Sequence, residues 1–108
     1  MSFQLLVQFP VKADQVDAFV DMLQGAKTRI AAADGCEGVE VLHSTENPTK
    51  VVLSEIWQSK AAHDVYAEKM RAAGSMNAMA EFLAGAPESE YFEIKSSVIV
   101  HCHSIMQG

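Results

Sequence analysis

Two residues that could do acid–base chemistry stand three positions apart near the middle of the sequence. His63 and Tyr66 follow Ser59 in a run of good helix formers, and residues three apart share one face of a helix. A neutral imidazole there could take a proton from a phenol or quinol, and the resulting anion could donate an electron to oxygen. The alternative is that His63 is a solvent-exposed helix residue. We take both residues as candidate catalytic side chains.

Glu55 and Trp57 precede this helix at the end of a predicted strand, and they share one face of it because they are two apart. Trp57 could stack on a planar substrate, and Tyr66 could hydrogen-bond a substrate oxygen. The alternative is that Trp57 is simply the largest residue of the core. If Glu55 is buried, its carboxyl group must be paired, protonated or hydrogen-bonded, and a salt bridge at a dimer interface is the other interpretation. Trp57 is the third candidate catalytic residue, and Glu55 is a candidate substrate contact.

Met70 and His43 complete the candidate substrate contacts. A methionine is soft enough to fill either a core or a ligand pocket. His43 lies in a predicted strand, where a solvated or interface histidine is the alternative. His101 and His103 share one face of the last predicted strand and could chelate a metal. Because no third ligand stands at a matching spacing, we predict no metal site.

The composition limits the classes of function. At 108 residues the chain is predicted to form one domain, residues 1–108, since shorter pieces could hardly bury a core. The net charge of −6 and the scattered basic residues argue against nucleic acid and against an acidic membrane surface. The sequence shows neither a transmembrane run nor a signal peptide, so we expect a cytoplasmic protein. Cys36 and Cys102 are expected to be free and partly buried.

Six main elements must position these residues. The sequence predicts strands over 3–9, 39–44, 51–57 and 91–103, helices over 14–33 and 59–73, and a shorter helical piece over 76–83. Asp14 and Ser59 are predicted N-caps, and Gly35 suits the left-handed residue that ends a helix. The order βαββαβ predicts a ferredoxin-like α+β domain, with an antiparallel sheet and both helices on one face. Apolar residues point both ways along the strands, so we expect a homodimer joined through its sheet faces.

Three segments carry a resemblance to a known family. They are Asp34-Gly35-Cys36-Glu37-Gly38, Ser44-Thr45-Glu46-Asn47-Pro48 and Glu55-Ile56-Trp57-Gln58-Ser59. In this order and spacing the chain resembles the antibiotic biosynthesis monooxygenase family of dimeric α+β barrels, which includes small quinol monooxygenases. The resemblance implies a homodimer that oxidises a small aromatic phenol or quinol with O₂ and without a bound cofactor.

The family's other branches leave alternatives open. Haem-degrading relatives have a haem-ligating His where this chain has Met76, and a second Trp where it has Tyr66. They also have an Asn in the first strand, where this chain has Val7 or Gln8. Many relatives carry a His at the position of Tyr66, whereas this chain has His63, so no role is transferred by position. The alternatives are a haem-degrading monooxygenase, a non-catalytic dimer that binds a small apolar molecule, and an isomerase or degrader of a small signalling molecule. Few Arg or Lys residues are placed to meet a phosphorylated substrate.

Overall fold

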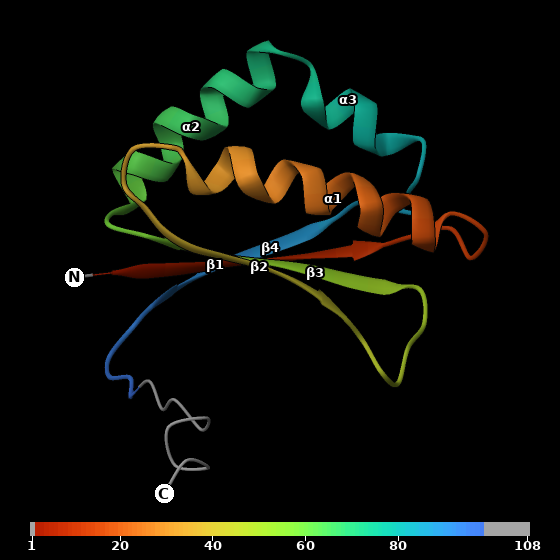
Figure 1. The fold of residues 1–108 in the computed structure, drawn as a ribbon, viewed down its shortest axis with the longest axis horizontal. Helices are drawn as coiled ribbons and strands as arrows, with labels where there is room; N and C mark the ends of the chain where they lie inside the picture. The colour runs from red at the N-terminus through yellow and green to blue at the C-terminus, as the bar shows by residue number, and fades with distance from the viewer. Residues whose placement is uncertain (1, 99–108) are drawn as a thin grey trace, which may run out of the picture.

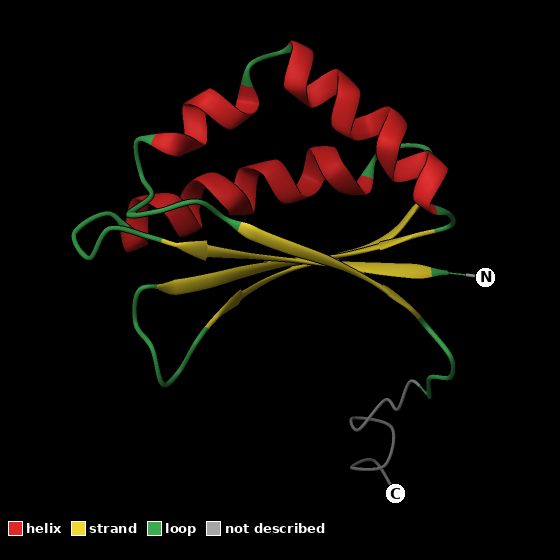
Figure 2. Cartoon of the chain, turned by 180° about the vertical axis from the view of Figure 1, so that it is seen from behind, coloured by secondary structure: helices red, strands yellow, loops and turns green. Residues whose placement is uncertain are grey.

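The computed structural model describes residues 2–98 and arranges them as one antiparallel sheet with helices on one of its faces (Figure 1). In chain order the elements are β1 (Phe3–Pro10), α1 (Val16–Ala31), β2 (Cys36–His43), β3 (Lys50–Trp57), α2 (Lys60–Ala72), α3 (Ser75–Ala80) and β4 (Glu88–Glu93). The strand order across the sheet is β2-β3-β1-β4, and every pair is antiparallel. Seen from behind, α1 lies on the sheet and α2 and α3 form an arch over it (Figure 2). The predicted α+β, ferredoxin-like fold is confirmed.

The last strand differs most from its prediction. The sequence predicts it over 91–103, but β4 begins at Glu88 and ends at Glu93, and residues 94–98 are not in a strand. The reason lies in its partner, because β4 pairs with β1 from Gln8 as far as Phe3, where β1 itself begins. Residues 99–103 lie outside the described residues, and so do the predicted positions of Cys102, His101 and His103. The second strand also begins earlier than predicted, at Cys36.

At the helix starts, one of the two predicted N-caps is confirmed and the other is wrong. Ser59 is the N-cap of α2, and its Oγ accepts a hydrogen bond from the Ala62 N–H at 3.1 Å, as predicted. The N-cap predicted at Asp14 is wrong, because Asp14 lies inside a turn that the Gln15 N–H closes by donating to the Lys12 carbonyl at 2.9 Å. Gln15 is the N-cap of α1 instead, without a side-chain bond. Gly35 has the predicted positive φ, at 87°.

Gly35 is also in close contact with α2, and this gives a first prediction. A Cβ at position 35 would lie 2.6 Å from the Cβ of Ala62, and the backbone there is left-handed. We therefore expect Gly35→Ala to lower the free energy of unfolding by about 2–4 kcal/mol, the sum of backbone strain and overpacking. Gly74→Ala is the matched control, because its φ is +80° but no atom lies within 4 Å. Urea titration measures both variants, and equal losses would show that the contact with Ala62 adds nothing.

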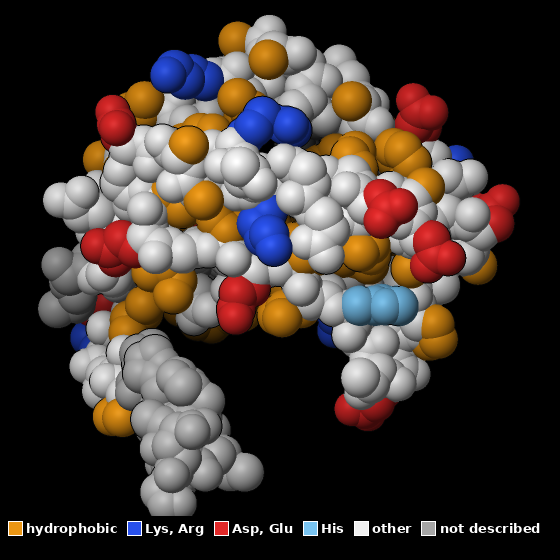
Figure 3. Space-filling model, viewed as in Figure 1, with side chains coloured by type: hydrophobic (Ala, Val, Ile, Leu, Met, Phe, Trp, Pro, Cys, Tyr) orange, Lys and Arg blue, Asp and Glu red, His pale blue; other side chains and the backbone are white. Residues whose placement is uncertain are grey.

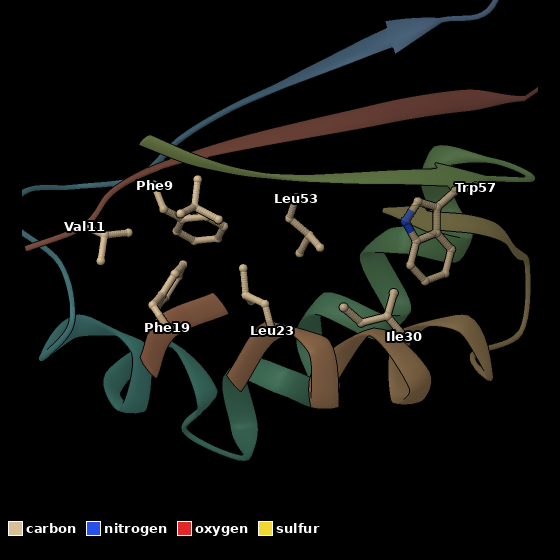
Figure 4. Packing of buried hydrophobic residues seen from close by; sticks show 8 residues of the cluster. Phe9, Val11, Phe19, Leu23, Ile30, Leu53 and Trp57 are labelled. Carbon is tan, nitrogen blue, oxygen red and sulfur yellow. The ribbon is translucent and has the colours of Figure 1, made fainter. Parts of the chain in front are cut away.

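The core lies between the sheet and α1 (Figure 4). Phe9, Val11, Leu53 and Trp57 come from the strand side, and Phe19, Leu23 and Ile30 come from α1. All of them are at most 5% exposed. The rings of Phe9 and Phe19 meet edge to face with their centroids 5.0 Å apart, and Trp57 is buried at the other end of the cluster. The sheet face that carries these side chains is therefore the one that faces the helices.

The opposite face of the sheet carries apolar side chains among polar ones, and no helix of residues 2–98 covers it (Figures 1 and 2). Directly paired residues in neighbouring strands point to the same face. By that register the apolar side chains on the uncovered face are Leu6, Leu42, Val52, Ile56 and Phe92. Leu42 is 45% exposed and Phe92 is 39% exposed. The prediction that apolar residues lie on both faces of the sheet is confirmed.

Candidate active site

A pocket lies between the helices and the covered face of the sheet. Its volume is about 380 Å³, which is within the range of small-molecule sites. All three helices and strands β1, β3 and β4 contribute to its wall, which is mostly aliphatic and aromatic. Among the side chains that could carry a proton or hold a polar substituent are Arg29, Glu55, His63, Tyr66, Arg71 and Tyr91. This combination of an apolar wall and a few converging polar groups makes it the candidate active site.

The start of α2 brings His63 into this pocket. Because Ser59 caps the helix directly after β3, the first turn of α2 folds back over Trp57. The ring centroids of His63 and Tyr66 lie 5.4 Å and 5.6 Å from that of Trp57. The His63 side chain is only 14% exposed. The shared face of His63 and Tyr66 is thus turned inward, and the alternative of a solvent-exposed His63 is wrong.

Tyr91 is a site residue that the sequence did not reveal. Its hydroxyl group and His63 Nδ1 form a hydrogen bond, and the two rings meet at a centroid distance of 5.4 Å. Tyr91 on β4 is paired with Leu5 on β1, and Leu5 is paired with Glu55 on β3. The three side chains therefore form a row across the helix-facing side of the sheet. The register of the strands is the signal that would have found Tyr91, and it cannot be read from one sequence.

Glu55 lines the pocket from β3 and is 5% exposed. Its Oε1 accepts a hydrogen bond from Trp57 Nε1 at 2.7 Å, and His63 Nε2 lies 4.0 Å from the same oxygen. Burial raises the pKa of the Glu55 carboxyl group, and the Trp57 hydrogen bond offsets part of that rise. The expectation of a hydrogen-bonded carboxyl is confirmed. Because Glu55 faces the helices, a salt bridge across the uncovered sheet face is not its role.

Trp57 does not occupy the position in which it could stack on a substrate. It is 1% exposed and does not line the pocket, because the side chains of α2 cover its ring. The structure places its indole in the core and its N–H on Glu55. Its contribution to the site is therefore to hold the carboxyl group under His63.

Of the two remaining candidate substrate contacts, one lines the pocket and the other does not. Met70 lines the pocket with His63 and Tyr66. His43 does not, because β2 pairs it with Val51 near the start of β3, and its exposed Nε2 lies 2.7 Å from the Pro48 carbonyl oxygen. Within residues 2–98 no three His, Cys, Asp or Glu side chains come together in a way that could hold a metal ion.

The protonation states of these groups suit a base beside two phenols. Burial is the main cause that lowers the pKa of His63, with Lys60 adding to the effect and Asp64 opposing it. Burial raises the pKa of Tyr66 and of Tyr91. At neutral pH the imidazole is therefore free to accept a proton, and both tyrosine hydroxyls keep theirs. This arrangement can deprotonate a weakly acidic hydroxyl group in the pocket.

The buried carboxyl group predicts a pH-dependent stability. A folded pKa above the ordinary 4.5 means that the contribution of Glu55 is complete below pH 4.5 and is lost as the pH rises through the folded pKa. Glu55→Gln keeps an oxygen acceptor for Trp57 but cannot ionise. We expect this variant to gain stability relative to the wild type across that window, by at most about 1.4 kcal/mol per pH unit. Urea titrations at several pH values measure the difference, and a difference that does not change with pH would contradict the assignment.

The comparisons with known proteins identify the family of this chain. The sequence model of the antibiotic biosynthesis monooxygenase family matches residues 2–72. The chain belongs to this family. The match runs from β1 through α2, so it includes His63, Tyr66 and Glu55 but not Tyr91. No curated protein matches the sequence closely enough to count as a relative.

Solved structures show the same fold. A conserved protein of Methanosarcina mazei Go1 is 18% identical, with a TM-score of 0.80 over 88% of this chain and 94% of its own. Rv0793 of Mycobacterium tuberculosis is also 18% identical, with a TM-score of 0.80 over 92% of this chain and 100% of its own. A monooxygenase of Streptomyces coelicolor in complex with nanaomycin D is 23% identical, with a TM-score of 0.78 over 93% of each chain. In the part of the chain that the structure describes, no helix has both the length and the apolar character to cross a membrane.

Proposed function

We propose that this family member is a cofactor-independent monooxygenase that oxidises a small aromatic phenol or quinol with O₂. The observation that carries the proposal is the hydrogen bond between Tyr91 and a neutral, partly buried His63, inside a pocket of suitable size. Membership of the family supports a monooxygenase, and the pocket supplies the site for an aromatic ring.

The proton is expected to travel through Tyr91. Because the Tyr91 hydroxyl keeps its proton, it donates the hydrogen bond to His63 Nδ1, which leaves the imidazole proton on Nε2 facing Glu55. A substrate hydroxyl bound beside Tyr91 passes its proton to the Tyr91 oxygen as Tyr91 passes its own to His63. The imidazolium that results lies 4.0 Å from Glu55 Oε1, and an ionised Glu55 stabilises it.

The substrate anion then supplies all of the electrons. One electron passes to O₂, and the resulting radical pair combines to form a carbon–oxygen bond and a peroxide. Loss of water from the peroxide leaves a new carbonyl group on the ring. One oxygen atom enters the product and the other leaves as water, with its two hydrogens drawn from the substrate. The four-electron reduction of O₂ is balanced by a four-electron oxidation of the substrate, so no separate reductant is needed.

Oxygen uptake tests this proposal. The purified, metal-stripped protein is mixed with a panel of naphthoquinols and hydroxyanthrones, and the rate is corrected for spontaneous autoxidation. We expect uptake that depends on protein concentration and is lost on heating. Uptake no faster than the background for the whole panel would contradict the proposal, and a haem titration would then separate a haem-degrading enzyme from a non-catalytic binding protein.

We also propose that two copies of the chain join through their uncovered sheet faces. The apolar side chains on that face, with Leu42 and Phe92 the most exposed, support it. Light scattering is expected to give twice the chain mass of 11.7 kDa. Phe92→Asp is expected to shift the mass to that of one chain, whereas Val65→Asp, 64% exposed on α2, leaves the dimer intact. A wild-type mass of one chain would contradict the proposal.

A further inference from the structure

The sequence contains only two arginines, and both line the candidate active site. Arg29 comes from the last turn of α1, and Arg71 comes from the last turn of α2. The six lysines lie elsewhere, and none of them lines this pocket. Arginines from two different helices thus line one small, mostly apolar cavity.

This concentration of positive charge opposes the charge of the whole chain. The net charge is −6, yet two arginines and only one carboxyl group, that of Glu55, line the pocket. In the space-filling view, basic side chains stand in the middle of the helical layer, and many of the acidic ones lie toward its edges (Figure 3). The pocket is therefore an electropositive site on an acidic protein, which favours an anionic ligand.

Within residues 2–98, neither arginine is paired with a buried acid. Arg29 has no carboxylate partner among residues 2–98, and its charge acts on the pocket wall, where it lowers the pKa of Tyr66 against the effect of burial. Arg71 forms an ion pair with Glu68 on the helix surface, where both side chains are about two-thirds exposed. Exposed pairs of this kind contribute little, and a guanidinium has five donors, so the pair leaves Arg71 able to bind a second acid.

We propose that the substrate is an aromatic carboxylate, whose acid group Arg29 and Arg71 bind while its hydroxyl group meets Tyr91 and His63. A guanidinium matches a carboxylate with two parallel hydrogen bonds, which orients the ring as well as attracting it. This inference rests on the proposed function for the role of the hydroxyl group. The sequence led us to expect few Arg or Lys residues placed to meet a phosphorylated substrate, yet the only two arginines both line this pocket.

Binding of a matched, unreactive pair of ligands tests the inference without turnover. The probes are 2-naphthoate and 2-naphthamide, which have nearly the same shape and differ in charge, and calorimetry gives their affinities for the full-length protein. We expect the affinity for naphthoate to be at least about fivefold higher than the affinity for naphthamide. Arg29→Gln and Arg71→Gln are each expected to weaken naphthoate binding about fivefold and to leave naphthamide binding within about twofold. Added salt weakens only the naphthoate complex.

The chain offers a matched control for each arginine. Lys27 and Lys69 lie two positions before Arg29 and Arg71 on the same helices, so they point to nearly the opposite side. Lys27→Gln and Lys69→Gln remove the same charge and are expected to leave naphthoate binding unchanged. Equal losses in the lysine and arginine variants, or equal affinities of the wild type for the two probes, would overturn the inference.

The outcome also separates this inference from the proposed reaction. A preference for naphthoate that depends on the arginines, in a protein that consumes no oxygen, supports the anion site and contradicts the oxygenase. Oxygen uptake with neutral quinols, in a protein that shows no preference for naphthoate, supports the oxygenase and contradicts the anion site.

Discussion

His63→Ala is expected to slow protein-dependent quinol oxidation by about 10²–10⁴-fold, the range in which a positioned general base contributes. The imidazole is the group in the pocket that burial holds neutral, and Tyr91 is hydrogen-bonded to it. Without it, the proton that leaves the substrate has no acceptor with a suitable pKa. Oxygen uptake at saturating quinol, at pH 7, measures the loss.

The control is His43→Ala, which removes an exposed histidine outside the pocket and should leave the rate unchanged. The pH profile gives a second readout. The wild-type rate is expected to rise with pH through the pKa of His63, which lies below the ordinary 6.5. This rise in rate should be absent in His63→Ala. Besides Glu55 and Tyr91, the charged groups near the imidazole are Lys60 and Asp64, with Asp64 Oδ1 at 3.9 Å from Nδ1. A folded His63→Ala variant that keeps the wild-type rate and profile would remove His63 from the mechanism.

Trp57→Ala is expected to lower the free energy of unfolding by about 3–5 kcal/mol, which is a large part of the total for a single domain. Trp57 is 1% exposed and is the largest fully buried side chain. Its loss leaves a cavity at one end of the core and also leaves the buried Glu55 without its indole donor. Urea or thermal unfolding followed by circular dichroism measures the change.

Two variants separate these causes. Val65→Ala truncates a 64% exposed residue of α2 and is expected to change stability by less than about 0.5 kcal/mol. Trp57→Phe keeps much of the side-chain volume but removes the indole N–H. Its loss of stability therefore measures mainly the hydrogen bond, and the further loss in Trp57→Ala measures the packing. A loss of less than about 1 kcal/mol in Trp57→Ala would show that the indole is not the packing centre that its burial indicates.

The parts of the fold that could be predicted depend on local signals. Apolar residues repeat at every second position in strands and at every third or fourth position in helices. The order of the elements therefore follows from the sequence alone. Ser59 is the predicted N-cap of α2, and Gly35 has the predicted positive φ, although α1 already ends at Ala31 with Ala32 as its C-cap. Asp14 failed because a turn that Gln15 closes competes with the helix start.

The parts of the site that could not be predicted depend on long-range geometry. Tyr91 reaches His63 only because β4 pairs with β1 in one particular register, and Arg29 and Arg71 line one cavity only because α1 and α2 both border it. The type of a residue also does not show whether its side chain lies in the core, in the pocket wall or at the surface. Trp57 is suited to stacking on a ligand, yet it is buried beneath the pocket wall, and His43 is suited to binding, yet it lies outside the pocket.

The most direct measurement is the fate of isotopically labelled oxygen. The metal-stripped protein is given a hydroxyanthrone under ¹⁸O₂, and mass spectrometry follows both the quinone and the water that form. We expect one ¹⁸O atom in each product molecule and the other in water, at a rate that depends on active protein. A product with no ¹⁸O above the level of spontaneous autoxidation would contradict the account, because the pocket would then not direct oxygen to the substrate.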